Sequence, residues 1–155
     1  MTNLLTLDPG NVTGWAVFTD KELEAAGVMK KAESFTIAPQ TGVRRRSGVW
    51  KPDLVLIEVP RWYPHDHSDV NDLLDLSVYV GELKHFYEAM GCVVELVWPR
   101  TWKGNVPKKI TNRRTVAALS PGELELLPRR PRAKDFDNNM LDAIGLGLWK
   151  LGRLR

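Results

Sequence analysis

The run at residues 54–59, LVLIEV, constrains the fold of this chain more than any other stretch. It is almost entirely apolar and rich in β-branched residues, which is typical of a central strand that is covered on both faces. Residues 72–90 then carry apolar side chains at helical intervals of three and four, and residues 93–98 form a second strand-like run. A strand, a helix and a strand in this order predict a crossover between parallel strands, with helices on the faces of the sheet.

The segments on either side of this unit complete the predicted fold. Three short strands at residues 4–7, 14–19 and 23–29 lie close in sequence and predict an antiparallel meander. Further helices are expected at residues 111–119, 122–127 and 138–151. The expected fold class is therefore α/β: a mixed five-stranded sheet, made of a meander plus parallel strands and flanked by helices, in a single domain over residues 1–155.

Charge is unevenly distributed along the chain. The net charge is +3, but residues 100–134 contain ten Lys or Arg and two Glu, a local net charge of +8 that leaves −5 for the rest. Such asymmetry favours a polyanionic partner such as nucleic acid, although a solvated basic face would show the same pattern.

Composition excludes several other classes of protein. A single cysteine, Cys92, excludes an internal disulfide and a cysteine-based zinc site, and it suits a reducing compartment. The apolar runs are too short to span a bilayer, and the N-terminus has no leader pattern. We therefore expect a cytoplasmic protein with no membrane partner.

Three acidic residues stand at comparable places in the predicted fold. Asp8 ends the first strand, Glu58 ends the apolar run and Asp142 lies on the last helix. If the first and fourth strands are neighbours, Asp8 and Glu58 share one edge of the sheet, where mutual repulsion favours a hard cation such as Mg²⁺ or Mn²⁺. Two such ions about 4 Å apart serve phosphodiester hydrolysis.

Each acidic residue also has an ordinary explanation. Asp8 opens an Asp-Pro-Gly sequence, which is common in turns. Glu58 could form an ion pair with Arg61, and Asp142 could be a solvated helix residue. The presence of all three together, two at strand ends and one on the last helix, favours a metal site over three separate ordinary explanations.

Four segments resemble the motifs of a known family. LDPGNVTGWAVF, LVLIEVP and LDAIGLGLW are similar to the acidic motifs of RuvC-type Holliday-junction endonucleases, within the ribonuclease-H-like superfamily. VWPRTWKGNVPKK resembles the segment with proline, lysine and glycine that follows the fifth strand in that family. The resemblance extends over nearly the whole chain, whose short form is most similar to compact phage-type members. It implies that Asp8, Glu58 and Asp142 are catalytic metal ligands.

The sequence departs from the family at one ligand position. The family has Asp or His three residues before the last aspartate, whereas this chain has Asn139. Positions three apart share a helix face, so Asn139 is predicted to join the catalytic metal ligands, although its amide oxygen brings no charge. Asp135 or Asp137 could supply that charge from the preceding loop. Alternatively, Asn139 is an inactivating substitution for aspartate.

The residues that follow Glu58 are candidates for DNA contacts. Arg61, Trp62 and Tyr63 come directly after the metal-ligand strand, and aromatic side chains there could stack on an unpaired base. The resemblance implies that an aromatic residue in this loop separates base pairs at the crossover, and Trp62 is the nearest candidate. The alternative is that Trp62 and Tyr63 cap the core.

Basic residues after the fifth strand are the other candidates for DNA contacts. Lys103, Lys108 and Lys109 lie around a glycine, an arrangement that suits close approach to a phosphate backbone. The resemblance implies that one lysine here faces the active site and holds the scissile phosphate. Lys108 is counted among the candidate catalytic residues, with Lys103 as the alternative. Arg113 and Arg114 are expected to contact the DNA backbone.

Together these features predict a Mg²⁺-dependent endonuclease that resolves four-way (Holliday) or other branched DNA, with two Mg²⁺ ions for which Mn²⁺ can substitute. The resemblance also implies a homodimer with the helix at residues 72–90 in its interface. The small size suggests the cytoplasm of a bacterial or phage-infected cell. The alternatives are a catalytically silent branched-DNA-binding protein and another ribonuclease-H-like nuclease that acts on RNA–DNA hybrid.

Overall fold

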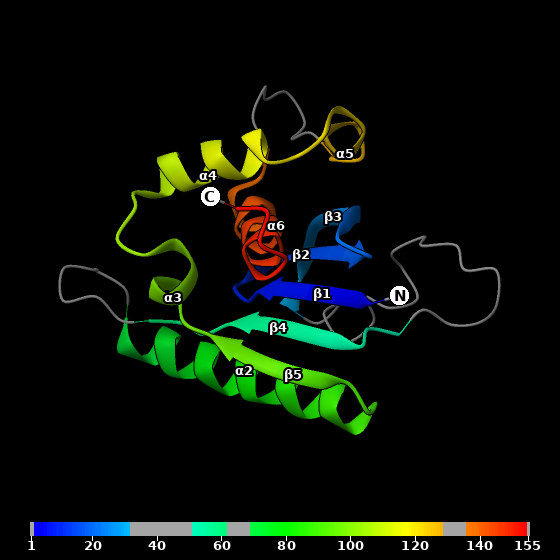
Figure 1. Ribbon diagram of the computed structural model, residues 1–155. Helices are drawn as coiled ribbons and strands as arrows, with labels where there is room; N and C mark the ends of the chain where they lie inside the picture. The colour runs from blue at the N-terminus through cyan, green and yellow to red at the C-terminus, as the bar shows by residue number, and fades with distance from the viewer. Residues whose placement is uncertain (1, 32–50, 62–68, 129–135, 155) are drawn as a thin grey trace.

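The computed structural model describes residues 2–31, 51–61, 69–128 and 136–154, and its centre is a five-stranded sheet (Figure 1). The strands are β1 (Asn3–Asp8), β2 (Val12–Thr19), β3 (Glu22–Lys30), β4 (Leu54–Glu58) and β5 (Val93–Val97). Their order is β3-β2-β1-β4-β5, antiparallel through the first three and parallel from β1 to β5. The predicted mixed sheet is confirmed, with β1 rather than β4 at its middle.

The two faces of the sheet are covered by different helices. Because strand side chains alternate between faces, β1 and β4 contribute to two separate cores. The core beneath α2 (Val70–Ala89) contains Leu5, Leu7, Val17, Val55, Ile57, Tyr79, Leu83 and Tyr87. The opposite core, beneath α6 (Asn138–Lys150), contains Leu4, Phe18, Leu56, Ile144, Leu146 and Leu148. This double coverage explains why the LVLIE strand is apolar at almost every position.

Local sequence sets the ends of the long helices. Asp69 caps α2 by accepting a hydrogen bond of 2.9 Å from the Asn71 amide, and Asp137 caps α6 by accepting one of 2.9 Å from the Asn139 amide. The chain leaves α2 through Gly91, whose φ of +75° favours glycine. Of the helices in the described ranges, none is long and apolar enough to cross a bilayer.

Two of the shorter helices differ from the sequence-based expectation. Pro99 does not merely end β5 but opens a helix, α3 (Pro99–Lys103), because proline fits the first helical position, where no amide donor is needed. Helix α4 (Lys108–Ala117) begins three residues before the predicted start, so Lys108 and Lys109 lie in its first turn. The remaining short helix, α5 (Pro121–Glu125), has a capping box formed by Ser120 and Glu123.

Candidate active site

Three acidic side chains meet at the carboxyl ends of β1 and β4. Leu7 pairs with Ile57 in parallel register, so the next residues, Asp8 and Glu58, end their strands side by side. Strand side chains alternate between faces, so Asp8 and Glu58 lie on the same face as Leu4 and Leu56, which is the face covered by α6. Asp142 of α6 is buried against this face with 3% of its surface exposed. The predicted edge shared by the three carboxylates is therefore present.

A glycine allows α6 to approach the sheet closely enough for this arrangement. A Cβ atom on Gly14 of β2 would lie 1.9 Å from the backbone oxygen of Asn139, so any other residue would push the first turn of α6 outward. Further along the helix, Thr6 of β1 donates a hydrogen bond of 2.7 Å from Oγ1 to the Ala143 carbonyl. These two contacts, on either side of Asp142, set its height above β1.

The electrostatics of the cluster are unfavourable for negative charge. Burial, followed by repulsion from Glu58 and Asp142, raises the pKa of Asp8 well above its ordinary value. Burial also raises the pKa of Glu58, although hydrogen bonds from Trp102 and Lys103 partly oppose this effect. Raised carboxyl pKa values from burial and like charge are a feature of functional sites.

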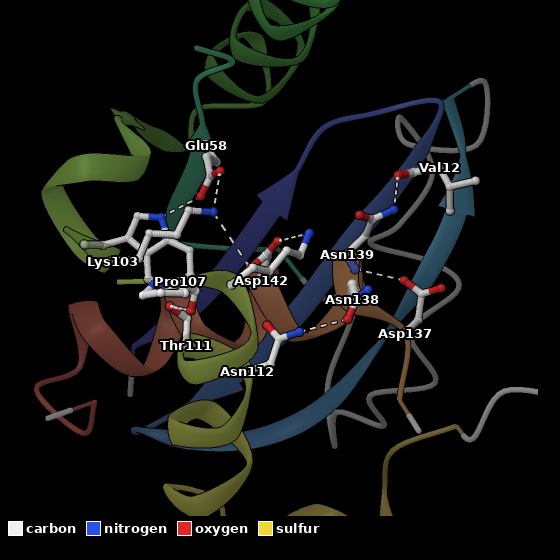
Figure 2. Close-up of polar contacts among 12 residues, drawn as sticks. Val12, Glu58, Lys103, Pro107, Thr111, Asn112, Asp137, Asn138, Asn139 and Asp142 are labelled. Carbon is white, nitrogen blue, oxygen red and sulfur yellow. Dashed lines mark hydrogen bonds and ion pairs between the residues drawn. The ribbon is translucent and has the colours of Figure 1, made fainter. Parts of the chain in front are cut away.

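Both lysines proposed as catalytic candidates contact the cluster, as Figure 2 shows for Lys103. Lys103 Nζ lies 3.1 Å from Glu58 Oε1 and 3.8 Å from Asp142 Oδ1. Lys108 Nζ lies 2.9 Å from Asp142 Oδ2. Burial tends to lower the pKa of Lys103, but attraction to Glu58 and Asp142 outweighs it and raises the pKa. Lys103 and Lys108 therefore both lie against the acidic cluster, where each contacts Asp142.

Sequence analysis missed one residue of this cluster. Trp102 of α3 is buried and donates a hydrogen bond of 2.5 Å from Nε1 to Glu58 Oε2. The available signal was its place directly before Lys103 in the segment that follows the fifth strand. Without α3 in the predicted fold, nothing showed that this indole turns toward Glu58.

Asn139 lies on α6, the helix that carries Asp142, and its side chain contacts β2. Its Nδ2 donates a hydrogen bond of 3.1 Å to the Val12 carbonyl (Figure 2). The carbonyl can only accept, so the amide nitrogen must face it, and an aspartate could not make this bond. Asp137 serves as the cap of α6, while Asp135 lies outside the described residues. A ligand role for Asn139 stays a prediction.

The chemistry of the three carboxylates suits a hard cation. Their oxygens are the ligands that Mg²⁺ and Mn²⁺ prefer, and the buried Asp142 Oδ1 has no hydrogen-bond partner within the described part of the chain. Among the described residues, no group of three or more His, Cys, Asp or Glu has an arrangement that could hold a metal ion. The ammonium groups of Lys103 and Lys108 now supply the positive charge, so these lysines would have to yield some contacts to a cation.

The remaining predicted DNA contacts divide into two groups. Trp62 and Tyr63 lie outside the described residues. Arg61 is described and lines an open hollow of about 430 Å³ with Trp98, Arg100 and Thr101. On α4, the side chains of Lys109, Arg113 and Arg114 are exposed. The described basic residues therefore flank the acidic cluster on the side of α3 and α4.

Comparison with solved structures identifies the fold. T. thermophilus RuvC in complex with a Holliday junction substrate is 17% identical and superposes with a TM-score of 0.62, over 100% of this chain and 99% of that chain. The structure of Thermus thermophilus RuvC is 14% identical, with a TM-score of 0.54 over 99% of each chain. No protein-family model and no curated protein matches the sequence. The chain thus has a ribonuclease-H-like fold. More closely, its fold is of the RuvC type.

Proposed function

We propose that this protein is a divalent-cation-dependent endonuclease that cuts four-way or other branched DNA. The observation that carries the proposal is the acidic cluster of Asp8, Glu58 and Asp142, which a RuvC-type fold places at one sheet edge beside two lysines. The similarity to a RuvC structure that holds a Holliday junction supports branched DNA as the substrate. The cytoplasm of a bacterial or phage-infected cell stays our prediction for its location.

The residues of the cluster have distinct tasks in this proposal. Asp8, Glu58 and Asp142 hold two Mg²⁺ ions, for which Mn²⁺ can substitute. Bound cations of this kind supply charge neutralisation at the scissile phosphate and a more acidic water. Lys108, which is about half exposed, is free enough to exchange its contact with Asp142 for a phosphate oxygen. Lys103 holds Glu58 and Asp142 together until substrate and cation arrive.

An exposed apolar stripe supports the proposal that the protein is a homodimer. Val70, Leu74 and Val78 follow each other at intervals of four along α2, with 57%, 58% and 63% of their surfaces exposed. Residues at this spacing share one face of a helix, which here is turned away from the sheet. A second copy of the chain would cover this stripe and bring two active sites to one junction.

Cleavage of a labelled mobile four-way junction, with and without Mg²⁺ or Mn²⁺, tests the proposed function. We expect paired symmetric nicks from this chain and none from an Asp142→Asn variant. An unlabelled RNA–DNA hybrid of equal length should compete poorly with the junction. Effective competition by the hybrid would instead identify another ribonuclease-H-like nuclease. Absence of a cation-dependent product from this chain would contradict the proposal.

A second candidate function, a binding protein that is catalytically silent, is favoured by Asn139. This residue brings no charge to the ligand position, and its amide is bonded to β2. The Asn139→Asp variant separates the two functions in the same assay. Nicks that appear only in this variant would show that the chain is a disabled nuclease. Tight junction binding without nicks in either protein would show that it is a binding protein.

A further inference from the structure

Trp102 holds one oxygen of a proposed catalytic carboxylate. Its Nε1 donates to Glu58 Oε2 at 2.5 Å, while Glu58 Oε1 accepts from Lys103 Nζ at 3.1 Å. We propose that Trp102 is a positioning residue, which reserves Oε1 of Glu58 for a cation by keeping Oε2 bonded to its indole. This inference rests on the proposed cation-dependent function and adds a residue that the acidic motifs do not contain.

The indole is fixed by packing as well as by its hydrogen bond. Trp102 has 6% of its surface exposed. A Cβ atom on Gly145 of α6 would lie 2.8 Å from an indole carbon, so the ring occupies space that only a glycine leaves open. Gly145 is three residues after Asp142 and lies on the same side of the helix. The indole therefore spans from the helix that carries Asp142 to the strand that carries Glu58.

The two donors to Glu58 differ in their freedom to leave. Lys103 has a flexible side chain that is 20% exposed, and its ammonium lies 4.8 Å from the centre of the Trp102 ring. Rotation about its side-chain bonds can move the ammonium away from Glu58. Trp102 cannot withdraw its N–H without leaving the core. Oε1 is thus the exchangeable oxygen of Glu58, and Oε2 is the fixed one.

Cation affinity of the folded protein without DNA tests this proposal, measured by calorimetric titration with Mn²⁺. Trp102→Phe removes the N–H but keeps an aromatic ring, and we expect Mn²⁺ to bind roughly tenfold more weakly or worse. Trp149→Phe is the matched control, because Trp149 packs at the border of the same core and should bind Mn²⁺ like the unmodified chain. Trp102→His keeps a ring N–H and should retain more affinity than Trp102→Phe.

A second background shows whether Trp102 acts through Glu58. In a Glu58→Gln chain, adding Trp102→Phe should cause no further loss of Mn²⁺ affinity. Equal affinity in Trp102→Phe and the unmodified chain would overturn the proposal, as would equal losses in the Phe and His variants or a full further loss in the Gln background. Failure of the unmodified chain to bind Mn²⁺ would overturn it too. Expected Mn²⁺ results without junction nicking would instead reject only the proposed function.

Discussion

Two buried carboxylate sites in this protein have opposite electrostatic characters. Glu123 of α5 accepts two hydrogen bonds of 2.7 Å from Arg153 and one of 2.8 Å each from the Leu23 and Ser120 amides. Burial alone would raise the pKa of Glu123, but these hydrogen bonds outweigh it and lower the pKa to about 2. At the acidic cluster, burial and mutual repulsion raise the pKa of Asp8 instead.

The opposite pKa changes mean that ionisation of Glu123 stabilises the folded state, whereas ionisation of Asp8 destabilises it. Glu123 joins β3, α5 and the chain after α6 through bonds to its charged form, so its ionisation stabilises the folded state. The pairing of β1 with β4 holds Asp8 beside Glu58, and α6 places Asp142 near both. Burial and these two charges raise the pKa of Asp8, so its ionisation destabilises the folded state. Such a cost is expected where a site is built to receive something positive.

The largest effect is expected on the cleavage rate when the Asp8 carboxylate is removed. Asp8→Asn should reduce cation-dependent cleavage by about 10³-fold or more, because a lost ligand removes several kcal/mol of transition-state stabilisation. Its free energy of unfolding without cation should be unchanged or higher, since one repelling charge is gone. Single-turnover cleavage and urea unfolding measure the two quantities. Clear destabilisation of this variant would mean that the Asp8 charge supports the fold.

The reverse pattern is expected at the paired site. Glu123→Gln leaves Arg153 without its carboxylate and should lower the free energy of unfolding by roughly 3 kcal/mol, while the folded protein keeps its cleavage rate. Glu125→Gln, at an exposed neighbouring position, is the control and should change little. A large loss of activity in folded Glu123→Gln protein would show that the two sites are coupled.

The pH dependence of stability should separate the sites further, at about 1.4 kcal/mol per unit of pKa difference. The pKa of Glu123 falls from 4.5 to about 2 on folding, so its contribution is present above pH 4.5 and disappears as the pH falls toward 2. The pKa of Asp8 rises on folding, so its penalty grows as the pH rises above the ordinary value of 3.8.

Urea unfolding across this range, without cation, checks both signs. The difference between the unmodified chain and Glu123→Gln should shrink toward acid pH. The stabilisation of Asp8→Asn over the unmodified chain should grow toward neutral pH. Parallel curves for all three proteins would show that neither carboxyl changes its pKa on folding.

The smallest effect is expected from the cation alone. Mn²⁺ at ten times its dissociation constant should raise the free energy of unfolding by about 1.4 kcal/mol, in the unmodified chain and in Glu123→Gln. Asp8→Asn should gain much less. Thermal unfolding with a matched concentration of a monovalent salt as control measures this shift. Equal stabilisation of all three proteins would place the cation somewhere other than the acidic cluster.

The sheet and the acidic cluster could be predicted because both depend on local patterns. Alternating and continuous apolar runs identified all five strands, and parallel pairing of β4 with β5 follows from the crossover through α2. The pairing of β1 with β4 was a condition of the predicted cluster, and the structure meets it. The contacts of Glu58 could not be predicted in this way. The sequence suggested Arg61 as an ion-pair partner, whereas Trp102 and Lys103 contact the carboxylate because Pro99 starts a helix. A proline that can either stop a strand or begin a helix leaves such contacts open until tertiary structure is known.

Successive side chains of β1 face the two cores in turn, so an odd or even position in the strand decides whether a residue packs under α2 or lies on the side of the acidic cluster. Leu5 and Leu7 face α2, whereas Thr6 reaches the Ala143 carbonyl on the other side and Asp8 follows it. Inserting one residue before Leu7 would leave a strand of similar hydrophobicity, yet it would turn the aspartate toward the α2 core and a leucine toward Asp142. In this strand a shift by one position is more damaging than most substitutions, because packing and chemistry would exchange sides.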